Sequence, residues 1–311
     1  MKKQFIIAEV GSNWLTKRHC IESIRRAKAC GANAVKFQAY NSKALYGHSG
    51  ELEGTLPLEW IPDLSKECFK VGINFMCSAF SAELVNFINP FVKYHKVASA
   101  ELCHIGILDA INKTEKTVFL SIGASNEKEV RFALSRLDQC KVILMYCTAS
   151  YPARYGSTTQ IYELRNKYKK PVGFSDHTLD VYEAPMNSIT YGSVAIEKHV
   201  NFCGVASPDS PHSLSEDEFA EMVSALRTNT IMTTPTPDER SMLSTHKRRL
   251  IAIKDIEIGD TLILGKNFDI LRAKTPMACI SPMFAEIVNG KKSNSKIKAF
   301  EGIKQNQVDF N

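Results

Sequence analysis

One pattern recurs through the first 200 residues of the chain and constrains its fold more than any other feature. Short runs of β-branched and apolar residues alternate with loops and segments of helical periodicity. The runs are almost continuously apolar at their starts, which is typical of strands buried on both faces of a parallel sheet. The eight runs are FIIAEVG (5–11), AVKFQAY (34–40), NFMCSAF (74–80), YHKVASA (94–100), VFLSIGA (118–124), VILMYCT (142–148), PVGFSDH (171–177) and VAIEKHV (194–200).

The segments between these runs predict helices. Residues 21–28, 127–137 and 216–226 place apolar side chains on one helical face, and successive runs start 20 to 40 residues apart, the size of one βα unit. Eight such units predict a closed (β/α)8 barrel, the TIM-barrel fold. An open doubly wound sheet is the alternative, but it would usually carry a glycine-rich phosphate loop after the first strand, where only Gly11 is present.

The repeat then ends. Residues 229–244 are polar, contain two prolines and predict a linker. Residues 245–311 alternate short apolar runs with turns, which predicts a small β-rich domain that we expect to need docking onto another surface for stability. We therefore predict a barrel over residues 1–228, a linker over 229–244 and a C-terminal domain over 245–311.

Composition narrows the functional class. Hydrophobic residues make up 44% and charged residues 23% of the chain, and no stretch reaches the ~20 apolar residues of a membrane helix. The basic and apolar N-terminus is too short for a signal peptide and is interrupted by Glu9. Nine cysteines without a CxxC pair predict reduced thiols, and with them a cytoplasmic location.

The net charge of +6 is uneven, because residues 244–311 hold 12 Lys/Arg against 7 Asp/Glu. This excess is either a solvated basic surface or an attraction for an anion, such as an acidic substrate or partner. The basic residues are not interleaved with aromatic ones, so we do not expect a nucleic-acid partner.

The polar residues of the barrel gather where its active site is expected. In this fold, catalytic side chains lie at the carboxyl ends of the strands. A single Ser or Thr there is commonly a helix N-cap, but so many polar residues on one face predict a site. The residues at these ends are Glu9, Lys36, Gln38, Ser78, Lys96, Ser99, Glu101, Ser121, Thr148, Ser175, Asp176, His177, Glu197, Lys198 and His199.

Charges inside apolar strands need partners. Lys36 lies within Ala-Val-Lys-Phe-Gln, so we expect an anion or a carboxylate beside it. Glu9 and Glu101 have the opposite charge, so we expect a positively charged partner beside each of them. His177 and His199 end consecutive strands, whose spacing of ~4.8 Å would let two imidazoles bind one metal ion. The alternative is two hydrogen-bonded core histidines. The residues alone thus predict metal-assisted carbon–carbon or phosphoryl chemistry on a small phosphorylated molecule.

Several ordered motifs resemble the sialic acid synthase family, which condenses phosphoenolpyruvate with N-acetylmannosamine-type sugars. The resemblance covers nearly the whole chain, including a tail similar to the family's antifreeze-like (β-clip) domain. The motifs are AEVGSN (8–13), GANAVKFQ (31–38), KVASAE (96–101), GFSDHT (173–178), IEKH (196–199), PDSPHSL (208–214) and, in the tail, residues 252–262 and 280–282.

The resemblance implies specific roles. His177 and His199 would bind a divalent metal, in this family Mn²⁺, and Glu101 and Glu9 would be catalytic. The remaining residues would hold the substrates, and the family forms homodimers in which one chain's C-terminal domain closes over its partner's barrel. The implied substrate residues are Lys36, Lys96, Ser78, Ser99, Ser121 and Ser175 for phosphoenolpyruvate, and Gln38, Tyr151 and Asp209 for the sugar.

The chain also departs from the family pattern. Ala149 stands where Asn or Ser is usual, Thr275 replaces an arginine, and Ala79 replaces a proline. These changes bear on the choice of sugar. Two alternatives to a sialic acid-type synthase therefore remain, which are a related aldol-type synthase that uses phosphoenolpyruvate with a different aldose, and a non-catalytic sugar-binding relative.

Overall fold

The computed structural model describes residues 3–40, 45–47, 54–154, 159–228, 247–272 and 279–310. The chain divides into two compact units, Met1–Met232 and Thr233–Asn311. Each unit is described by itself. The predicted linker 229–244 lies outside the described residues, as does Thr275.

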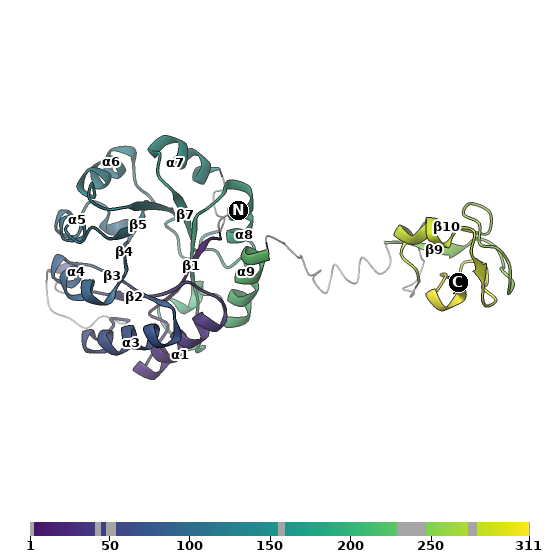
Figure 1. The fold of residues 1–311 in the computed structure, drawn as a ribbon, viewed down its shortest axis with the longest axis horizontal. Helices are drawn as coiled ribbons and strands as arrows, with labels where there is room; N and C mark the ends of the chain where they lie inside the picture. Colours follow the sequence, from purple (N-terminus) through teal and green to yellow (C-terminus); the bar gives the residue numbers. More distant parts are fainter. Residues whose placement is uncertain are drawn as a thin grey trace. The chain divides into compact units, whose positions relative to one another are not determined.

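The first unit contains a closed barrel of eight parallel strands (Figure 1). Neighbours in the chain are neighbours in the sheet, and the first strand closes the barrel against the eighth. Each of the eight apolar runs forms one strand, so the predicted fold is confirmed. The strands are β1 (Phe5–Gly11), β2 (Ala34–Ala39), β3 (Asn74–Ala79), β4 (Tyr94–Val97), β5 (Thr117–Ser121), β6 (Val142–Tyr146), β7 (Val172–Asp176) and β8 (Ala195–His199).

A helix follows every strand, and the helices form a ring around the barrel (Figure 1). The buried positions in α6 and α9 follow the apolar spacing seen in the sequence. The eight outer helices are α1 (Lys17–Ala29), α3 (Ile61–Val71), α4 (Ala82–Ile88), α5 (Ile105–Asn112), α6 (Glu127–Arg136), α7 (Gln160–Tyr168), α8 (Glu183–Tyr191) and α9 (Glu216–Thr228).

Two separate apolar layers stabilise the barrel. The larger packs the outer faces of the strands against the helices, and the smaller cluster includes Ile7, Met76, Phe119 and Met145. Gly173 is needed beside this smaller layer, because a methyl group there would lie 2.6 Å from the Met145 sulfur. The apolar cluster precedes the polar strand ends in sequence, so the carboxyl end of the barrel is left for polar residues.

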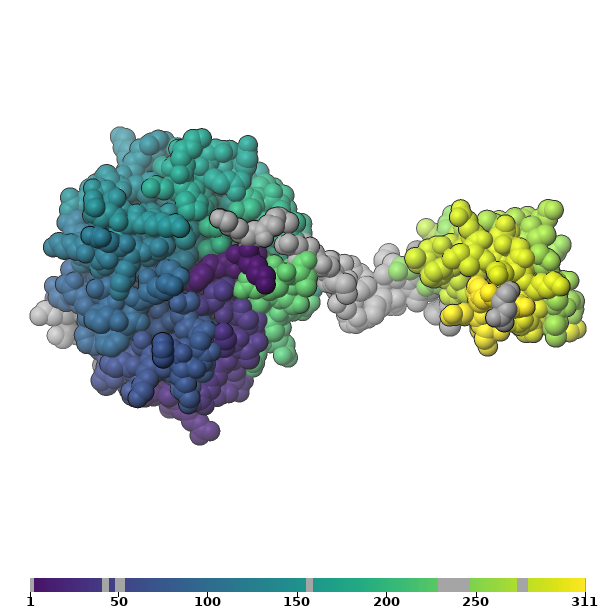
Figure 2. All heavy atoms as spheres, in the orientation of Figure 1, coloured from purple at the N-terminus to yellow at the C-terminus, as the bar shows by residue number. Residues whose placement is uncertain are grey.

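The last helix secures the start of the barrel. The Arg227 guanidinium on α9 donates to the Gln4 carbonyl at 2.8 Å and to Asn33 Oδ1 at 2.8 Å. Figure 2 shows the purple start of the chain against the green surface of this helix. These hydrogen bonds connect the last helix of the first unit to the residues that precede β1 and β2. No helix in the described parts of the chain is both long and apolar enough to cross a membrane.

The second unit is small and β-rich. Its own apolar core includes Leu250, Phe268, Val288 and Ile303. Two antiparallel two-stranded sheets surround this core, as predicted for a small C-terminal domain. The elements are β9 (Arg248–Ala252), β10 (Phe268–Arg272), α11 (Ala285–Val288), β11 (Lys292–Ser293) and β12 (Val308–Asp309).

Candidate active site

A small cavity of about 60 Å³ opens at the carboxyl ends of the barrel strands. Eleven of the thirteen residues predicted from the sequence line it, and only Glu101 and Asp209 of that set do not. The lining residues are Glu9, Lys36, Gln38, Ser78, Lys96, Ala98, Ser99, Ser121, Cys147, Tyr151, Ser175, His177, Glu197 and His199.

Strand register brings the charged residues together. Glu9 on β1 pairs in register with Lys36 on β2 and with His199 on β8. Lys36 Nζ lies 2.7 Å from Glu9 Oε2 and 3.7 Å from Glu197 Oε1, and Lys96 Nζ lies 3.1 Å from the same Glu197 oxygen. All four side chains are buried. The carboxylate that the sequence required beside Lys36 is therefore present, and it is shared with a second lysine.

Hydroxyl and amide groups complete this network. Lys36 Nζ donates to Ser78 Oγ at 3.3 Å, and Ser175 Oγ donates to Glu197 Oε1 at 3.0 Å. Gln38 donates to Glu9 Oε1 at 3.1 Å. A cluster of buried charges joined in this way is costly to maintain, and such clusters are commonly found at functional sites.

The two carboxyl groups differ in their affinity for protons. Burial, only partly opposed by the charge of Lys36, raises the pKa of Glu9 to about 7. Burial also acts to raise the pKa of Glu197, but the charges of Lys36 and Lys96 outweigh it and lower that pKa to about 2. At neutral pH Glu197 is ionised, whereas Glu9 is poised to gain or lose a proton.

Several residues that line the cavity carry a buried polar atom without a hydrogen-bond partner among the described residues. These atoms include Ser121 Oγ, Glu197 Oε2 and His199 Nδ1. An unsatisfied buried donor or acceptor costs roughly 1–3 kcal/mol, so such atoms point to a bound molecule or ion. The cavity thus offers a hydroxyl, a carboxylate oxygen and an imidazole nitrogen to a ligand.

His177 is suited to bind a metal ion. Its Nδ1 lies 2.8 Å from the Thr148 carbonyl oxygen, which can only accept a hydrogen bond, so the lone pair is left on Nε2. The His177 and His199 rings lie 5.9 Å apart between centroids. Burial lowers the pKa of His177 to about 4 and that of His199 to about 3, so both rings are neutral at pH 7. Neutral imidazoles can bind a divalent ion, and the role of this pair stays a prediction.

The segment bearing His177 is held in place by a buried ion pair. Lys198 faces away from the cavity, since its neighbours Glu197 and His199 face into it, and its Nζ lies 2.6 Å from Asp176 Oδ2. The same Nζ donates to the Thr178 carbonyl at 2.7 Å. This ion pair fixes the end of β7 against β8, where both histidines lie.

Asp209 lies beside the cavity because a glycine leaves room for it. Its Oδ2 accepts a hydrogen bond of 2.8 Å from the Ser12 backbone N–H and lies 4.0 Å from His199 Nδ1. A methyl group on Gly11 would lie only 2.0 Å from this oxygen, and Gly11 has a φ of +54°. The glycine of the AEVGSN motif is therefore required by a close approach as well as by its backbone conformation.

Glu101 is placed differently from the other predicted residues. It ends the short 3-10 helix Ser99–Glu101 and is half-buried, and it does not line the cavity. Burial raises its pKa, opposed only by the charge of His104. Its catalytic role stays a prediction.

Three residues at or beside the site have no role assigned from the sequence. Glu197 shares the inward face of β8 with His199, and this period of two was the available signal. Cys147 follows β6 and lies 3.2 Å, sulfur to oxygen, from Ser99 Oγ. His212 lies in a loop, where no strand periodicity marks it, yet its ring centroid is 4.7 Å from that of His199.

The fold and the cavity define the chain as a βα-barrel with a cluster of charged side chains at the carboxyl ends of its strands. A model of the NeuB family matches residues 23–235. The chain belongs to this family, and it is an enzyme of the sialic acid synthase type.

Similar proteins cover almost the whole chain. An uncharacterised protein of Methanocaldococcus jannaschii, MJ1065, is 32% identical over 94% of this chain and 91% of its own length. The pseudaminic acid synthase of Campylobacter jejuni serotype O:2 is 29% identical over 98% of this chain and 96% of its own length. Among solved structures, a sialic acid synthetase from Leptospira borgpetersenii is 27% identical, with a TM-score of 0.68 over 78% of this chain and 90% of its own.

Proposed function

We propose that this chain condenses phosphoenolpyruvate with an N-acetylmannosamine-type amino sugar, giving a nine-carbon 2-keto sugar acid and phosphate. One observation carries the proposal. Two buried lysines, two buried carboxyl groups and two neutral histidines line a single cavity at the mouth of a NeuB-family barrel. The relatives named as pseudaminic and legionaminic acid synthases support the same class of product.

Phosphoenolpyruvate has a carboxylate and a phosphate, and we assign both to the lysine side of the cavity. Lys36 and Lys96 would supply positive charge, and the hydroxyls of Ser78, Ser99, Ser121 and Ser175 would supply hydrogen bonds. The unpartnered Ser121 Oγ supports this assignment, since an anionic oxygen would satisfy it. Glu197 keeps the two lysines in place when the substrate is absent.

We assign the sugar to the histidine side. His177 and His199 would hold a divalent ion, which we propose is Mn²⁺, and this ion would polarise the aldehyde carbonyl as a Lewis acid. Gln38, Tyr151 and Asp209 would contact the sugar. His177 and Tyr151 are stacked, with ring centroids 4.2 Å apart, so the tyrosine also fixes the ring of one metal ligand.

The reaction requires one carbon–carbon bond to form and one carbon–oxygen bond to break. C3 of phosphoenolpyruvate attacks the aldehyde carbon, water adds to C2, and the C2–O bond breaks to release phosphate and leave a ketone. Glu9, with its pKa of about 7, would hold a proton beside the aldehyde oxygen. Glu101 would handle protons at C2, a role that rests on the family resemblance.

The second unit has a proposed role as well. We infer that residues 245–311 form an antifreeze-like domain that, joined by a linker over 229–244, closes over the barrel mouth of a second copy in a cytoplasmic homodimer. This inference rests on the family resemblance and on an apolar groove in the unit, which is lined by residues that include Ile280, Phe284 and Ile287.

Product analysis tests the proposal. The protein is incubated with phosphoenolpyruvate, Mn²⁺ and a panel of N-acylated mannosamines and their deoxy relatives, and the products are measured by mass spectrometry. A product with the mass of a nonulosonic acid, and phosphate release that needs both substrates and a divalent ion, is expected. Lys96→Met should abolish release, whereas Lys93→Met, which removes an exposed lysine just before the start of β4, should not.

Other outcomes separate the alternatives. Turnover with a shorter aldose alone would indicate a related aldol-type synthase. Ligand binding without any phosphate release would indicate a non-catalytic relative, for which Ala149 and Thr275 are the sequence features. Full activity in excess chelator would exclude the metal.

A further inference from the structure

We propose that Asp209 and His212 join His199 as protein ligands of the metal ion, so that the ion is held by a His–Asp–His set that extends beyond the predicted pair. The inference rests on the proposed metal site and names the side chains that complete it. Ligand atoms of these three residues all lie within 4.8 Å of one another. Among the described residues, this is the one group of three or more His, Cys, Asp or Glu side chains whose ligand atoms lie this close together.

The open nitrogens are the first argument. His199 Nδ1 and His212 Nε2 are buried, and neither makes a hydrogen bond with any described residue. The two residues are 7% and 8% exposed. Asp209 Oδ1 lies 3.4 Å from His212 Nε2 without the alignment of a hydrogen bond, and Asp209 Oδ2 lies 4.0 Å from His199 Nδ1. A cation between these atoms would satisfy all of them.

His177 provides a contrast. Both of its nitrogens have polar neighbours, since Nδ1 lies 2.8 Å from the Thr148 carbonyl and Nε2 lies 3.4 Å from Ser175 Oγ. Its ring is 5.9 Å from that of His199 between centroids, whereas the His212 ring is 4.7 Å from it. The His212 ring is therefore nearer to His199 than the His177 ring is, and its Nε2 has no hydrogen-bond partner among the described residues.

Local sequence explains how Asp209 and His212 come to face the same point. Ser210–His212 forms one turn of 3-10 helix with a proline near its start. Side chains three residues apart align along a 3-10 helix, so Asp209 and His212 lie one above the other. The Leu214 backbone N–H donates to the His199 carbonyl at 3.0 Å, which fastens this turn to the end of β8.

The donor set suits a divalent transition ion. Two imidazoles and one carboxylate are typical ligands of Mn²⁺, Fe²⁺, Co²⁺ and Zn²⁺, and three protein ligands leave positions open for a substrate oxygen. The Asp209 carboxylate is held beside the two rings because its Oδ2 accepts a hydrogen bond of 2.8 Å from the Ser12 backbone N–H.

Metal binding without substrates tests the inference. Full-length apoprotein is titrated with Mn²⁺, and free Mn²⁺ is measured by electron paramagnetic resonance. His212→Asn is expected to weaken binding by roughly 10- to 100-fold, by analogy with the loss of a group that supports a metal site. His104→Asn is the matched control, since His104 is exposed and caps α5, where asparagine is also a good cap. It should bind Mn²⁺ like the wild type.

A spectroscopic measurement distinguishes a ligand from a neighbour. Electron spin-echo envelope modulation counts imidazole nitrogens coupled to Mn²⁺, and His212→Asn should show one fewer than wild type. An unchanged count would overturn the assignment even if affinity fell, as would unchanged affinity. If His212→Asn fails to fold, His212→Gln is measured in the same way, and wild-type binding by it would also overturn the assignment.

The outcome is separable from that of the proposed reaction. Weakened Mn²⁺ binding in His212→Asn together with no product from any sugar would support the metal ligands and reject the synthase. Product formation together with Mn²⁺ binding that is unchanged in His212→Asn would support the synthase and reject the metal ligands.

Discussion

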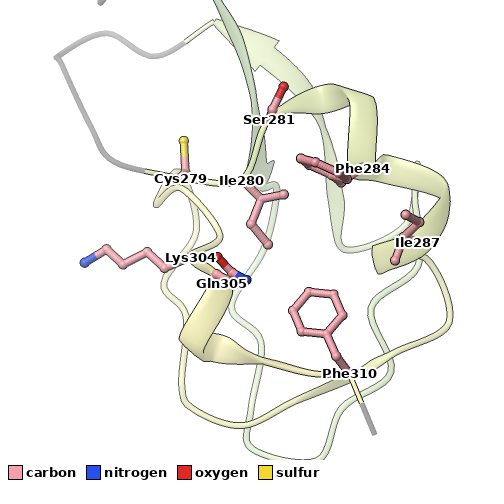
Figure 3. Close-up of a pocket in the computed structure, with 8 residues that line it drawn as sticks. All are labelled: Cys279, Ile280, Ser281, Phe284, Ile287, Lys304, Gln305 and Phe310. Carbon is pink, nitrogen blue, oxygen red and sulfur yellow. The ribbon is translucent and has the colours of Figure 1, made fainter.

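The two units of the chain present hollows of opposite character. The barrel cavity is small, about 60 Å³, and is lined by two lysines and two carboxyl groups with their hydroxyl partners. The second unit has a groove of about 650 Å³ lined mainly by apolar side chains, and Figure 3 shows Ile280, Phe284, Ile287 and Phe310 around one space. Among the groove's lining residues, Lys304 is the one that is charged at neutral pH.

The comparison shows that the larger hollow is not the one that holds the cluster of charged side chains. The groove is the larger of the two, yet none of its described lining residues has a carboxyl group or an imidazole. The barrel cavity is tightly filled by its own charges, so a substrate must exchange partners with them. Chemistry is therefore expected in the barrel, and a contact with another apolar surface is expected at the groove.

The largest expected effect comes from removing a charge from the cavity. Lys36→Met leaves the buried Glu9 and Glu197 without one of their cations, and breaking a buried pair in this way costs about 3–5 kcal/mol. The free energy of unfolding, measured in urea, should fall by that amount. Phosphate release should be lost as well.

Lys304→Met in the groove is the matched change for this test. Because Lys304 makes no ion pair with any described residue, its loss should leave the free energy of unfolding within about 0.5 kcal/mol of wild type. An equal fall in the free energy of unfolding in Lys36→Met and Lys304→Met would contradict the proposed difference between the cavity and the groove.

A glycine gives the next largest effect. Gly11→Ala places a methyl group 2.0 Å from Asp209 Oδ2 at a φ of +54°, so the carboxylate must move and the backbone is strained. Strain of this kind costs roughly 1–3 kcal/mol, and weaker Mn²⁺ binding should accompany it. Gly204→Ala is the control, because Gly204 also has positive φ, +62°, but nothing lies near its missing side chain. Metal affinity that is reduced equally in both would contradict the role of Asp209.

Much of this arrangement follows from the sequence, because strand periodicity fixes both the barrel and the direction of its polar side chains. Lys36 and Ser175 could be placed in one cavity from their positions at strand ends. Register also brings Glu197 there, since it lies two residues before His199. Glu197 is among the polar residues expected at the strand ends, but a role can be assigned only once the structure shows that Glu197 lines the cavity and Lys198 does not.

Residues in loops could not be placed in this way. His212 reaches the site through a turn of 3-10 helix whose flanks are hydrogen-bonded to Ser12, just after β1, and to His199 of β8. Ser12 is nearly 200 positions earlier in the chain. Glu101 shows the converse, because its position after a strand predicted a place in the cavity that the short helix Ser99–Glu101 does not give it. Periodicity constrains strands, whereas loop side chains depend on long-range contacts.

Glu9 predicts a pH effect that is confined to the barrel. Its pKa is about 7 in the folded chain against an ordinary value of 4.5, so the folded state binds the extra proton. The stability contributed by that proton is present below about pH 4.5 and is lost as pH rises through about 7. Urea unfolding of wild type and Glu9→Gln from pH 5 to 8 should show wild type losing stability relative to the variant.

The difference in unfolding free energy between wild type and Glu9→Gln reports on Glu9 alone, because the histidines are present in both. Parallel curves for wild type and Glu9→Gln over this range would mean that Glu9 is ionised throughout. The proton proposed beside the aldehyde oxygen would then have to come from another group.

The smallest effect on folding is expected at the groove. Ile287 is 55% exposed, so Ile287→Ser removes little buried surface and should change the free energy of unfolding by less than about 0.5 kcal/mol. If a second copy covers the groove, the same change should shift the protein toward monomer in sedimentation experiments, with Phe284→Ser acting in the same direction. Ile258→Ser, which removes another exposed residue of the unit that is not in the groove, should leave association unchanged. Monomer formation in all three variants, or in none, would show that the groove is not the contact surface, and the apolar lining would then need a different partner.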